Sequence, residues 1–401
     1  MTSTTTDRQQ AETERRMAVE AAIEDCRARP IREVAAELQL GLEEKSGWLS
    51  GPCPVCGGHD RFNINTRDGG FFCRKGCEAR GSGPIDLVMV TLRLEFMDAV
   101  LEMHGDLPEK VTQEELDRRR AQRAKAEEKR AAEAERHREK AIEGARGIWT
   151  RARGQGMQPV RDYLALRGLT PERLPELPGC LRYLPDQAYV LKRVVDGRRE
   201  LVTMHRGPAM IAAIQGPDGR LTCVHQTWFD LSRPKGRPEI LWQGERQRNK
   251  LTRGSQRRAA IRLITPDRFD TLVMGEGIET TLTAAVAWRE ALGPEVAYWA
   301  GISLGHMAGK MRKIPGKRYS GLPDMACEDG FYPPPWVRRL IFVMDGDSDP
   351  GPTRAKLECG IRRAMRLNPG LRGQIVPAGE GVDLNDLIAP SSPAETATDP
   401  R

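Results

Sequence analysis

Four of the nine cysteines form two closely spaced pairs. Cys53 and Cys56 enclose two residues, Cys73 and Cys77 enclose three, and sixteen residues separate the pairs. Zinc prefers four thiolates at tetrahedral geometry, and two short pairs supply them with little distortion of the chain. With all four positions filled, the metal has no open position for a substrate. We therefore predict a structural zinc site; the alternative, four incidental cysteines, is disfavoured by the paired spacing.

Acidic side chains follow three separate apolar runs. The residues are Glu276, then Asp345, Asp347 and Asp349, then Asp383. In an open parallel sheet, functional sites form at the carboxyl ends of the strands, so acids from separate strands converge on one edge. Clustered carboxylates need a cation, and hard oxygen ligands suit Mg²⁺ or Mn²⁺. We predict that Glu276, Asp345 and Asp347 are catalytic and that all five residues are candidate ligands of this metal.

Each acidic motif also has a plainer interpretation. Asp345 to Asp349 could be a polar surface turn, and Glu276 could be an acid stabilised by the start of a helix. The sequence leaves two roles for Glu279: it could assist the metal site, or merely occupy the first turn of its helix, where acids are stabilised. An EF-hand calcium loop is disfavoured because Pro350 interrupts it.

Basic residues form a run without any acid immediately before the first acidic motif. The run holds Arg246, Arg248, Lys250, Arg253, Arg257, Arg258 and Arg262. We predict that the first six contact nucleic-acid or nucleotide phosphates, although a solvated surface is the ordinary role of any one of them. The same is predicted for three residues near the cysteines: Arg61, Arg74 and Lys75.

Composition limits the class of protein. The 401 residues carry a formal charge of +7, which permits a polyanion as partner without requiring one. An odd cysteine count and a polar N-terminus disfavour an exported disulfide scaffold, and no apolar run is long enough to span a bilayer. We expect a soluble, cytoplasmic protein that does not bind membranes. The absence of a GxxxxGK[ST] loop excludes a P-loop motor.

The elements that must position these residues fall into several segments. Pro30 divides an apolar-periodic stretch into two helices, residues 85–103 are predicted to form a further helix, and Gln113–Arg146 forms a charged helix without an apolar seam. Residues 210–214 and 221–225 flank a Gly-Pro-Asp-Gly turn, which predicts a hairpin. Strands at 271–274, 296–300, 340–344 and 374–376 alternate with helices at 279–292 and 354–367, which predicts a parallel sheet.

The predicted fold class is therefore a multidomain α+β and α/β protein with an N-terminal zinc ribbon, a helical linker and a C-terminal Rossmann-like parallel sheet. We expect a disordered tail over 1–17, helices with the zinc ribbon over 18–105 and the linker over 106–147. A basic mixed subdomain over 148–262, the parallel-sheet domain over 263–390 and a tail over 391–401 follow.

Two motifs resemble those of one protein family. Cys53-Pro-Val-Cys56-Gly-Gly-His-Asp60-Arg61-Phe62, with Cys73 and Cys77, resembles the zinc-binding domain of bacterial, phage and plasmid DNA primases. Gly275-Glu276-Gly277-Ile278-Glu279-Thr280, with Asp345-Gly-Asp347 and Asp383-Leu-Asn385-Asp386, resembles the Toprim catalytic domain, especially that of mobile elements. The second cysteine pair departs from the family, in which two residues usually separate the thiols.

The resemblance implies a primase that makes RNA primers on single-stranded DNA from ribonucleoside triphosphates. It implies that Glu276 acts near the attacking 3′-hydroxyl, that Asp345 and Asp347 bind the metals, and that a separate helicase is a partner. Two alternatives share these motifs: a Toprim-type metal-dependent nuclease, and a non-catalytic recombination mediator that binds DNA.

Overall fold

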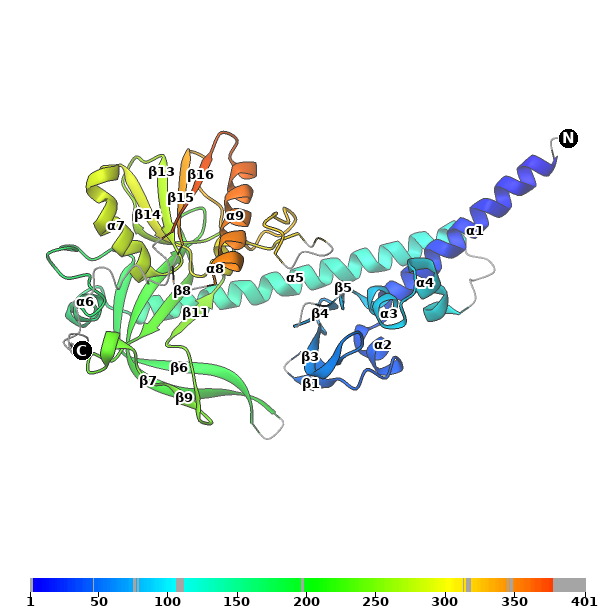
Figure 1. Cartoon of the computed structure of the whole chain (residues 1–401), viewed down its shortest axis with the longest axis horizontal. Coiled ribbons are helices and arrows are strands. Elements are labelled where there is room, and N and C mark those ends of the chain that lie inside the picture. The colour runs from blue at the N-terminus through cyan, green and yellow to red at the C-terminus, as the bar shows by residue number, and fades with distance from the viewer. Residues whose placement is uncertain are drawn as a thin grey trace, which may run out of the picture. The chain divides into compact units, whose positions relative to one another are not determined.

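A computed structural model describes residues 3–45, 47–74, 77, 79–105, 112–195, 198–312, 314, 319–344, 346 and 349–377 (Figure 1). The chain divides into two compact units, Met1–Glu133 and Ala134–Arg401. The boundary lies within one helix, α5 (Gln113–Arg151). Within the described residues, no helix is long and apolar enough to cross a membrane.

The first unit combines four helices with an antiparallel sheet. The helices are α1 (Ser3–Ala28), α2 (Ile31–Glu37), α3 (Pro84–Leu92) and α4 (Phe96–His104). The strands follow one another in the sheet in chain order: β1 (Glu43–Lys45), β2 (Trp48–Cys53), β3 (Gly57–Asn65), β4 (Gly70–Cys73) and β5 (Arg80–Ser82). Pro30 separates α1 from α2, as predicted, because its ring cannot continue a helix.

Alternation along the strands gives this sheet one apolar face. Phe62, Ile64 and Phe71 are buried in a core that also contains Cys53 and Cys73. The core extends under α2, α3 and α4, so the helices cover the face from which two of the four cysteines project. The thiols are thus attached to a packed framework, whereas the opposite face of the sheet stays available to solvent.

The second unit begins with an antiparallel sheet of long strands. Helix α6 (Gln158–Ala165) precedes β6 (Leu181–Val195), β7 (Arg198–Gln215) and β8 (Leu221–Trp228). The predicted hairpin is present between β7 and β8, where Gly216 N–H donates to the carbonyl of Arg220 at 2.9 Å. Strand β11 (Lys250–Gly254) pairs with β8, giving the order β11-β8-β7-β6. Short elements lie between them: η1 (Pro234–Gly236), β9 (Leu241–Trp242) and β10 (Glu245–Arg246).

The predicted parallel sheet forms the rest of this unit. Its order is β12-β14-β13-β15-β16, and only β12 runs antiparallel to its neighbour. The strands are β12 (Ile261–Ile264), β13 (Thr271–Gly275), β14 (Val296–Ala300), β15 (Arg339–Met344) and β16 (Arg372–Pro377). The helices are α7 (Ile278–Leu292), α8 (Leu304–Ala308) and α9 (Pro350–Leu367) (Figure 1).

Both faces of the parallel sheet are covered by helices. Val273 packs in a cluster with Ala284 of α7, whereas Leu272 and Met274 pack in another with Leu357 of α9. This two-sided burial explains why β13 to β15 read as continuous apolar runs in the sequence. The predicted fold class is confirmed: an antiparallel cysteine-bearing sheet, a long helix and a mixed sheet that is mainly parallel.

Two features differ from the sequence expectations in detail. Helix α1 begins at Ser3 and so includes residues assigned above to a tail. The predicted 85–103 helix is two helices, because Arg93 adopts a left-handed conformation (φ 57°) that ends α3.

Candidate functional site

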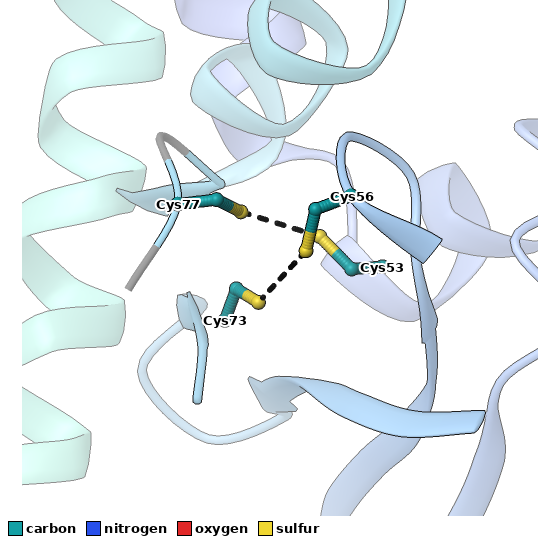
Figure 2. A group of neighbouring side chains, drawn as sticks. All are labelled: Cys53, Cys56, Cys73 and Cys77. Carbon is teal, nitrogen blue, oxygen red and sulfur yellow. Dashed lines mark hydrogen bonds between the residues drawn. The ribbon is translucent and has the colours of Figure 1, made fainter. Parts of the chain in front are cut away.

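The four cysteines of the predicted zinc site come together in the first unit. Their sulfur atoms all lie within 4.8 Å of one another, and all four side chains turn toward a common centre (Figure 2). The Sγ atoms of Cys53 and Cys77 are 3.6 Å apart, and those of Cys56 and Cys73 are 3.5 Å apart. Within the described residues, no other group of three or more His, Cys, Asp or Glu side chains is clustered in this way.

These distances fit a tetrahedral metal. Four sulfurs held about 2.3 Å from zinc are separated by roughly 3.8 Å, which matches the observed spacing closely. Gly57 and Gly58 turn the chain between the first pair of cysteines and β3 with φ of 66° and 91°. Residues with a side chain rarely adopt such angles, so the tight turn requires glycine at both positions.

The solvent-facing side of the cysteine-bearing sheet carries aromatic and basic groups. Trp48 on β2 and Phe72 on β4 form an edge-to-face pair with ring centroids 6.1 Å apart, and both are substantially exposed. Arg74 follows β4, and its guanidinium lies 3.5 Å from the carboxylate of Asp60. Arg61 is half-buried and packs against Gly58. Sequence analysis missed the aromatic pair because the two residues are distant along the chain.

Glu276 lies in a rigid turn between β13 and α7. Thr281 Oγ1 accepts a hydrogen bond from Gly275 N–H at 3.2 Å and donates one to the Gly277 carbonyl at 2.7 Å. A side chain at Gly275 would meet Thr281 Oγ1 at 2.8 Å, so this glycine is required by close packing. Gly277, by contrast, has a φ of −108°, which is accessible to any residue.

Glu276 lines a cleft of about 640 Å³, here called the Glu276 cleft. The cleft lies between the antiparallel sheet and the ends of β13 and β14. Its ionisable lining residues are Tyr163, Arg167, His225, Arg237, Arg246, Arg248, Lys250, Glu276 and Glu279. Three residues of the predicted basic run and the first predicted acid therefore share one cavity.

Glu279 forms a buried cluster at the wall of this cleft. The phenol of Tyr163 donates to Glu279 Oε1 at 2.6 Å, and Lys250 Nζ donates to Oε2 at 2.9 Å. The Glu279 side chain is 4% exposed and that of Lys250 38%. Both carboxylate oxygens are thus engaged by protein groups, which gives Glu279 a role that neither sequence interpretation included. Tyr163 has no local sequence signal, because its partner is 116 positions away.

Protonation states in this cluster follow from burial and charge. Burial disfavours the charged carboxylate, but Lys250 and Tyr163 outweigh it and hold the pKa of Glu279 well below its usual range. Burial together with the negative charge of Glu279 raises the pKa of Tyr163 well above its usual range. Burial, reinforced by Lys250, lowers the pKa of His225 to about 4. At neutral pH the cluster therefore contains a carboxylate, an ammonium, a phenol and a neutral imidazole.

The structure divides the basic run into residues that face the cleft and residues engaged elsewhere. Arg246 and Arg248 line the cleft and form no ion pair with any residue that the structure describes. Arg257 and Arg258 both pair with Glu328. Arg253 donates to the carbonyl of Val190, and Arg262 stacks over Trp299 at 4.6 Å. A run that is continuous in sequence is thus not one continuous track.

Several predicted site residues fall outside the described part of the chain: Lys75, Asp345, Asp347 and Asp383. Asp349 is described, is exposed, and caps α9, with its Oδ1 accepting from Gly351 N–H at 3.2 Å. This capping role explains an aspartate at position 349 without a metal, and among the described residues no partner of its second carboxylate oxygen is found.

Residues 139–263 match a protein-family model described as a domain of unknown function, DUF7146. The matched segment contains Tyr163, His225 and Lys250 and ends before Glu276. Part of the Glu276 cleft, but not its predicted metal ligand, therefore belongs to this family segment. Among curated proteins, no match to the chain was found.

The structure is similar to several solved primase structures at low sequence identity. The zinc-binding and RNA polymerase domains of the Aquifex aeolicus primase match at 14% identity and a TM-score of 0.31, covering 92% of this chain and 81% of that one. The primase fragment of the bacteriophage T7 primase-helicase protein matches at 14% identity and a TM-score of 0.29, covering 84% and 92%.

A DnaG primase catalytic domain bound to single-stranded DNA matches at 14% identity and a TM-score of 0.36, covering 64% of this chain and 78% of that one. Identities and TM-scores this low do not establish a shared activity.

Proposed function

We propose that the protein is a DNA primase that synthesises short RNA primers on single-stranded DNA during replication of a phage, plasmid or other mobile element. One observation carries the proposal: Glu276 shares a cleft with Arg246 and Arg248 at the carboxyl ends of parallel strands. A carboxylate supplies a metal ligand, and the guanidinium groups offer paired N–H donors to phosphate oxygens. The motif resemblance to Toprim primases supports the same function.

The strand order supports Asp345 and Asp347 as partners of Glu276. Strands β13 and β15 are parallel neighbours, with Met274 opposite Phe342, so both end at the same edge of the sheet. Glu276 comes shortly after the end of β13, and Asp345 directly follows the last residue of β15. We propose that these acids, together with Asp383, bind Mg²⁺ or Mn²⁺, and that Asp349 contributes its free oxygen.

In this proposal the residues of the cleft have different roles in nucleotidyl transfer. Arg246 and Arg248 hold the triphosphate of the incoming ribonucleotide, and Glu276 lies near the attacking 3′-hydroxyl. When metal ions are bound by the acids, they would lower the pKa of that hydroxyl and neutralise negative charge on the leaving pyrophosphate. A bond forms between the 3′-oxygen and the α-phosphorus of the ribonucleotide, and the bond between that phosphorus and the leaving pyrophosphate breaks. Lys250, paired with Glu279, presents its remaining N–H donors to the same cleft.

The first unit is proposed to hold a structural zinc ion and to contact the template. The four thiols fit zinc by distance and by their number, which leaves no open coordination position. Trp48 and Phe72 are exposed, so unpaired bases can stack on their rings. Arg74 lies two residues after Phe72 in the sequence, so it can contact a phosphate beside a stacked base.

Template-dependent synthesis tests the proposal directly. Purified protein is incubated with single-stranded DNA, Mg²⁺ and labelled ribonucleotides over a panel of initiation trinucleotides, with and without a separately supplied helicase. We expect short RNA products from the wild type and none from Glu276→Gln. Glu290→Gln is the matched control, because Glu290 is an exposed acid on α7 outside the cleft.

Three outcomes would contradict the proposal. Absence of product from the wild type on every template would support a binding protein such as a recombination mediator. Shortening of the DNA would support a nuclease. Unchanged synthesis by Glu276→Gln would place the chemistry outside the Glu276 cleft.

A further inference from the structure

A second cavity of about 400 Å³, here called the Gln226 cavity, lies in the second unit. It is bounded by the last turns of α5 and by strands β6, β7, β8 and β11. Its polar and charged lining residues are Arg151, Asp186, Gln187, Arg206, Gln226 and Arg253. No residue of the cavity lies in the Glu276 cleft apart from Leu251, which borders both.

The two cavities lie on opposite faces of the same antiparallel sheet. Successive side chains of a strand point to opposite faces. On β8, His225 lines the Glu276 cleft and Gln226 lines the Gln226 cavity. On β11, Lys250 lines the former and Arg253 the latter. The basic run therefore supplies cations to two separate sites.

Gln226 leaves a buried hydrogen-bond donor without a partner. Its Oε1 accepts from Gln187 Nε2 at 2.7 Å, whereas its own Nε2 has no hydrogen-bond partner within the described structure. The residue is 1% exposed, so bulk water does not satisfy this amide. A buried unsatisfied N–H group is costly, and a bound acceptor would relieve that cost.

Arginines give the cavity a positive character that favours an anionic acceptor. Arg206 pairs with Asp186 at 2.5 Å, and most of its five N–H donors have no partner among the residues that the structure describes. Arg253 donates to the Val190 carbonyl, and Arg151 is exposed at the rim. Three guanidinium groups and one carboxylate therefore surround a roomy polar space.

We propose that the Gln226 cavity binds a phosphate group, with Gln226 Nε2 as the buried donor and Arg206 and Arg253 as the charged donors. Every residue of this site lies within 139–263, the segment that matches the family of unknown function. The proposed site contains none of the predicted metal ligands, and Arg253 is the residue that it shares with the predicted phosphate-contacting run. Its phosphate could belong to a free nucleotide or to a nucleic-acid backbone.

Calorimetric titration with inorganic phosphate, at constant ionic strength set with sodium chloride, tests the proposal on the full-length chain. The background variant carries Arg246→Gln and Arg248→Gln, which removes two of the cations that line the Glu276 cleft. In that background, Gln226→Leu and Arg206→Gln should each weaken phosphate binding by about tenfold or more, because each removes a donor to an ion.

Arg220→Gln is the matched control for the loss of charge. Like Arg206, Arg220 is an exposed arginine that pairs with an aspartate, Asp218, at 3.7 Å, but it lies in the turn between β7 and β8, outside the cavity. The affinity of the Arg220→Gln variant for phosphate should stay within about twofold of that of the background variant. Arg206 is a surface side chain, so this variant remains informative if Gln226→Leu fails to fold.

Equal phosphate binding by the background, Arg206→Gln and Gln226→Leu proteins would overturn the proposal. So would absence of phosphate-specific heat, which would mean that water alone fills the cavity. Parallel titrations separate the two sources of phosphate. A free-nucleotide site predicts that Arg206→Gln weakens binding of a ribonucleoside triphosphate, whereas a backbone site predicts weaker binding of a single-stranded oligonucleotide.

Discussion

The Lys250–Glu279 ion pair is asymmetric, and the asymmetry decides how its two halves respond to substitution. Glu279 is 4% exposed at its side chain and cannot regain water, whereas Lys250 is 38% exposed and can. Leaving a buried charge without its partner costs about 3–5 kcal/mol in typical proteins. The full penalty applies only when the carboxylate is the charge left behind.

Lys250→Met should therefore destabilise the protein more than Glu279→Gln. The first leaves a buried carboxylate with Tyr163 as its remaining partner, and the second leaves an ammonium that can be hydrated. The double variant Lys250→Met, Glu279→Gln should recover part of the loss. Urea unfolding of the four proteins, combined as a double-mutant cycle, measures this coupling. Equal losses for the two single variants would mean that Glu279 is not the buried member of the pair.

His225 makes stability depend on pH. Its pKa is lowered from 6.5 to about 4 in the folded protein, so between these values the unfolded chain binds more protons. Stability then falls as the pH drops from 6.5 toward 4. Because each pH unit of difference is worth about 1.4 kcal/mol, the loss reaches about 3 kcal/mol.

His225→Asn should flatten this dependence. Urea midpoints of the wild type and the variant, measured from pH 7 to pH 4, should converge as the pH falls. The paired Glu279 carboxylate adds its own loss only below its unfolded pKa, near 4.5, because its folded pKa is depressed. Parallel curves for the two proteins down to pH 4 would contradict a neutral, buried His225.

At the scale of elements, local patterns predicted the strands well and the partners of the cleft poorly. The strands β13, β14 and β15 read directly as buried apolar runs, and α7 and α9 follow them with helical periodicity. The Tyr163–Glu279 contact could not be predicted, because nothing in either local segment specifies the other. The division of the basic run also needed the strand register, which places Lys250 opposite Thr227 and Arg253 opposite Val224.

The cysteine-bearing sheet should depend on its metal. Cys53 and Cys73 belong to the core of the first unit, and burial raises the pKa of the Cys77 thiol to about 12 when no metal is bound. A chelator should therefore release about one zinc per chain and increase hydrogen exchange across β2 to β4. The strands β13 to β15 serve as the internal control and should keep their protection. Full protection of β2 to β4 after complete zinc removal would show that the thiols pack without a metal.

At the scale of the whole molecule, the distribution of charge is more informative than its sum. The net charge of +7 is modest for a chain of this length. Arg257 and Arg258 both pair with the carboxylate of Glu328, whereas Arg246 and Arg248 face the Glu276 cleft without a described acidic partner. Two pairs of arginines that are close in sequence therefore differ in what they offer to a polyanion.

This difference predicts the salt dependence of binding to single-stranded DNA. Replacing Arg246 and Arg248 with Gln should lower the slope of log affinity against log salt by about 1.4, since each phosphate contact contributes about 0.7. Replacing Arg257 and Arg258 with Gln removes the same formal charge and should leave the slope nearly unchanged. Fluorescence anisotropy over a salt series measures both, and equal effects would mean that the ion pairs with Glu328 open on binding.

The alternation along β8 and β11 constrains how this sheet can change during evolution. A substitution at His225 or Gln226 alters one face and leaves the other intact, so the two cavities can diverge independently. A deletion of one residue between Lys250 and Arg253 would instead place both side chains on the same face of the sheet, so one of the two sites would lose its cation. We expect length variation among related sequences to be confined to the connections around the two strands, with the spacing inside them invariant.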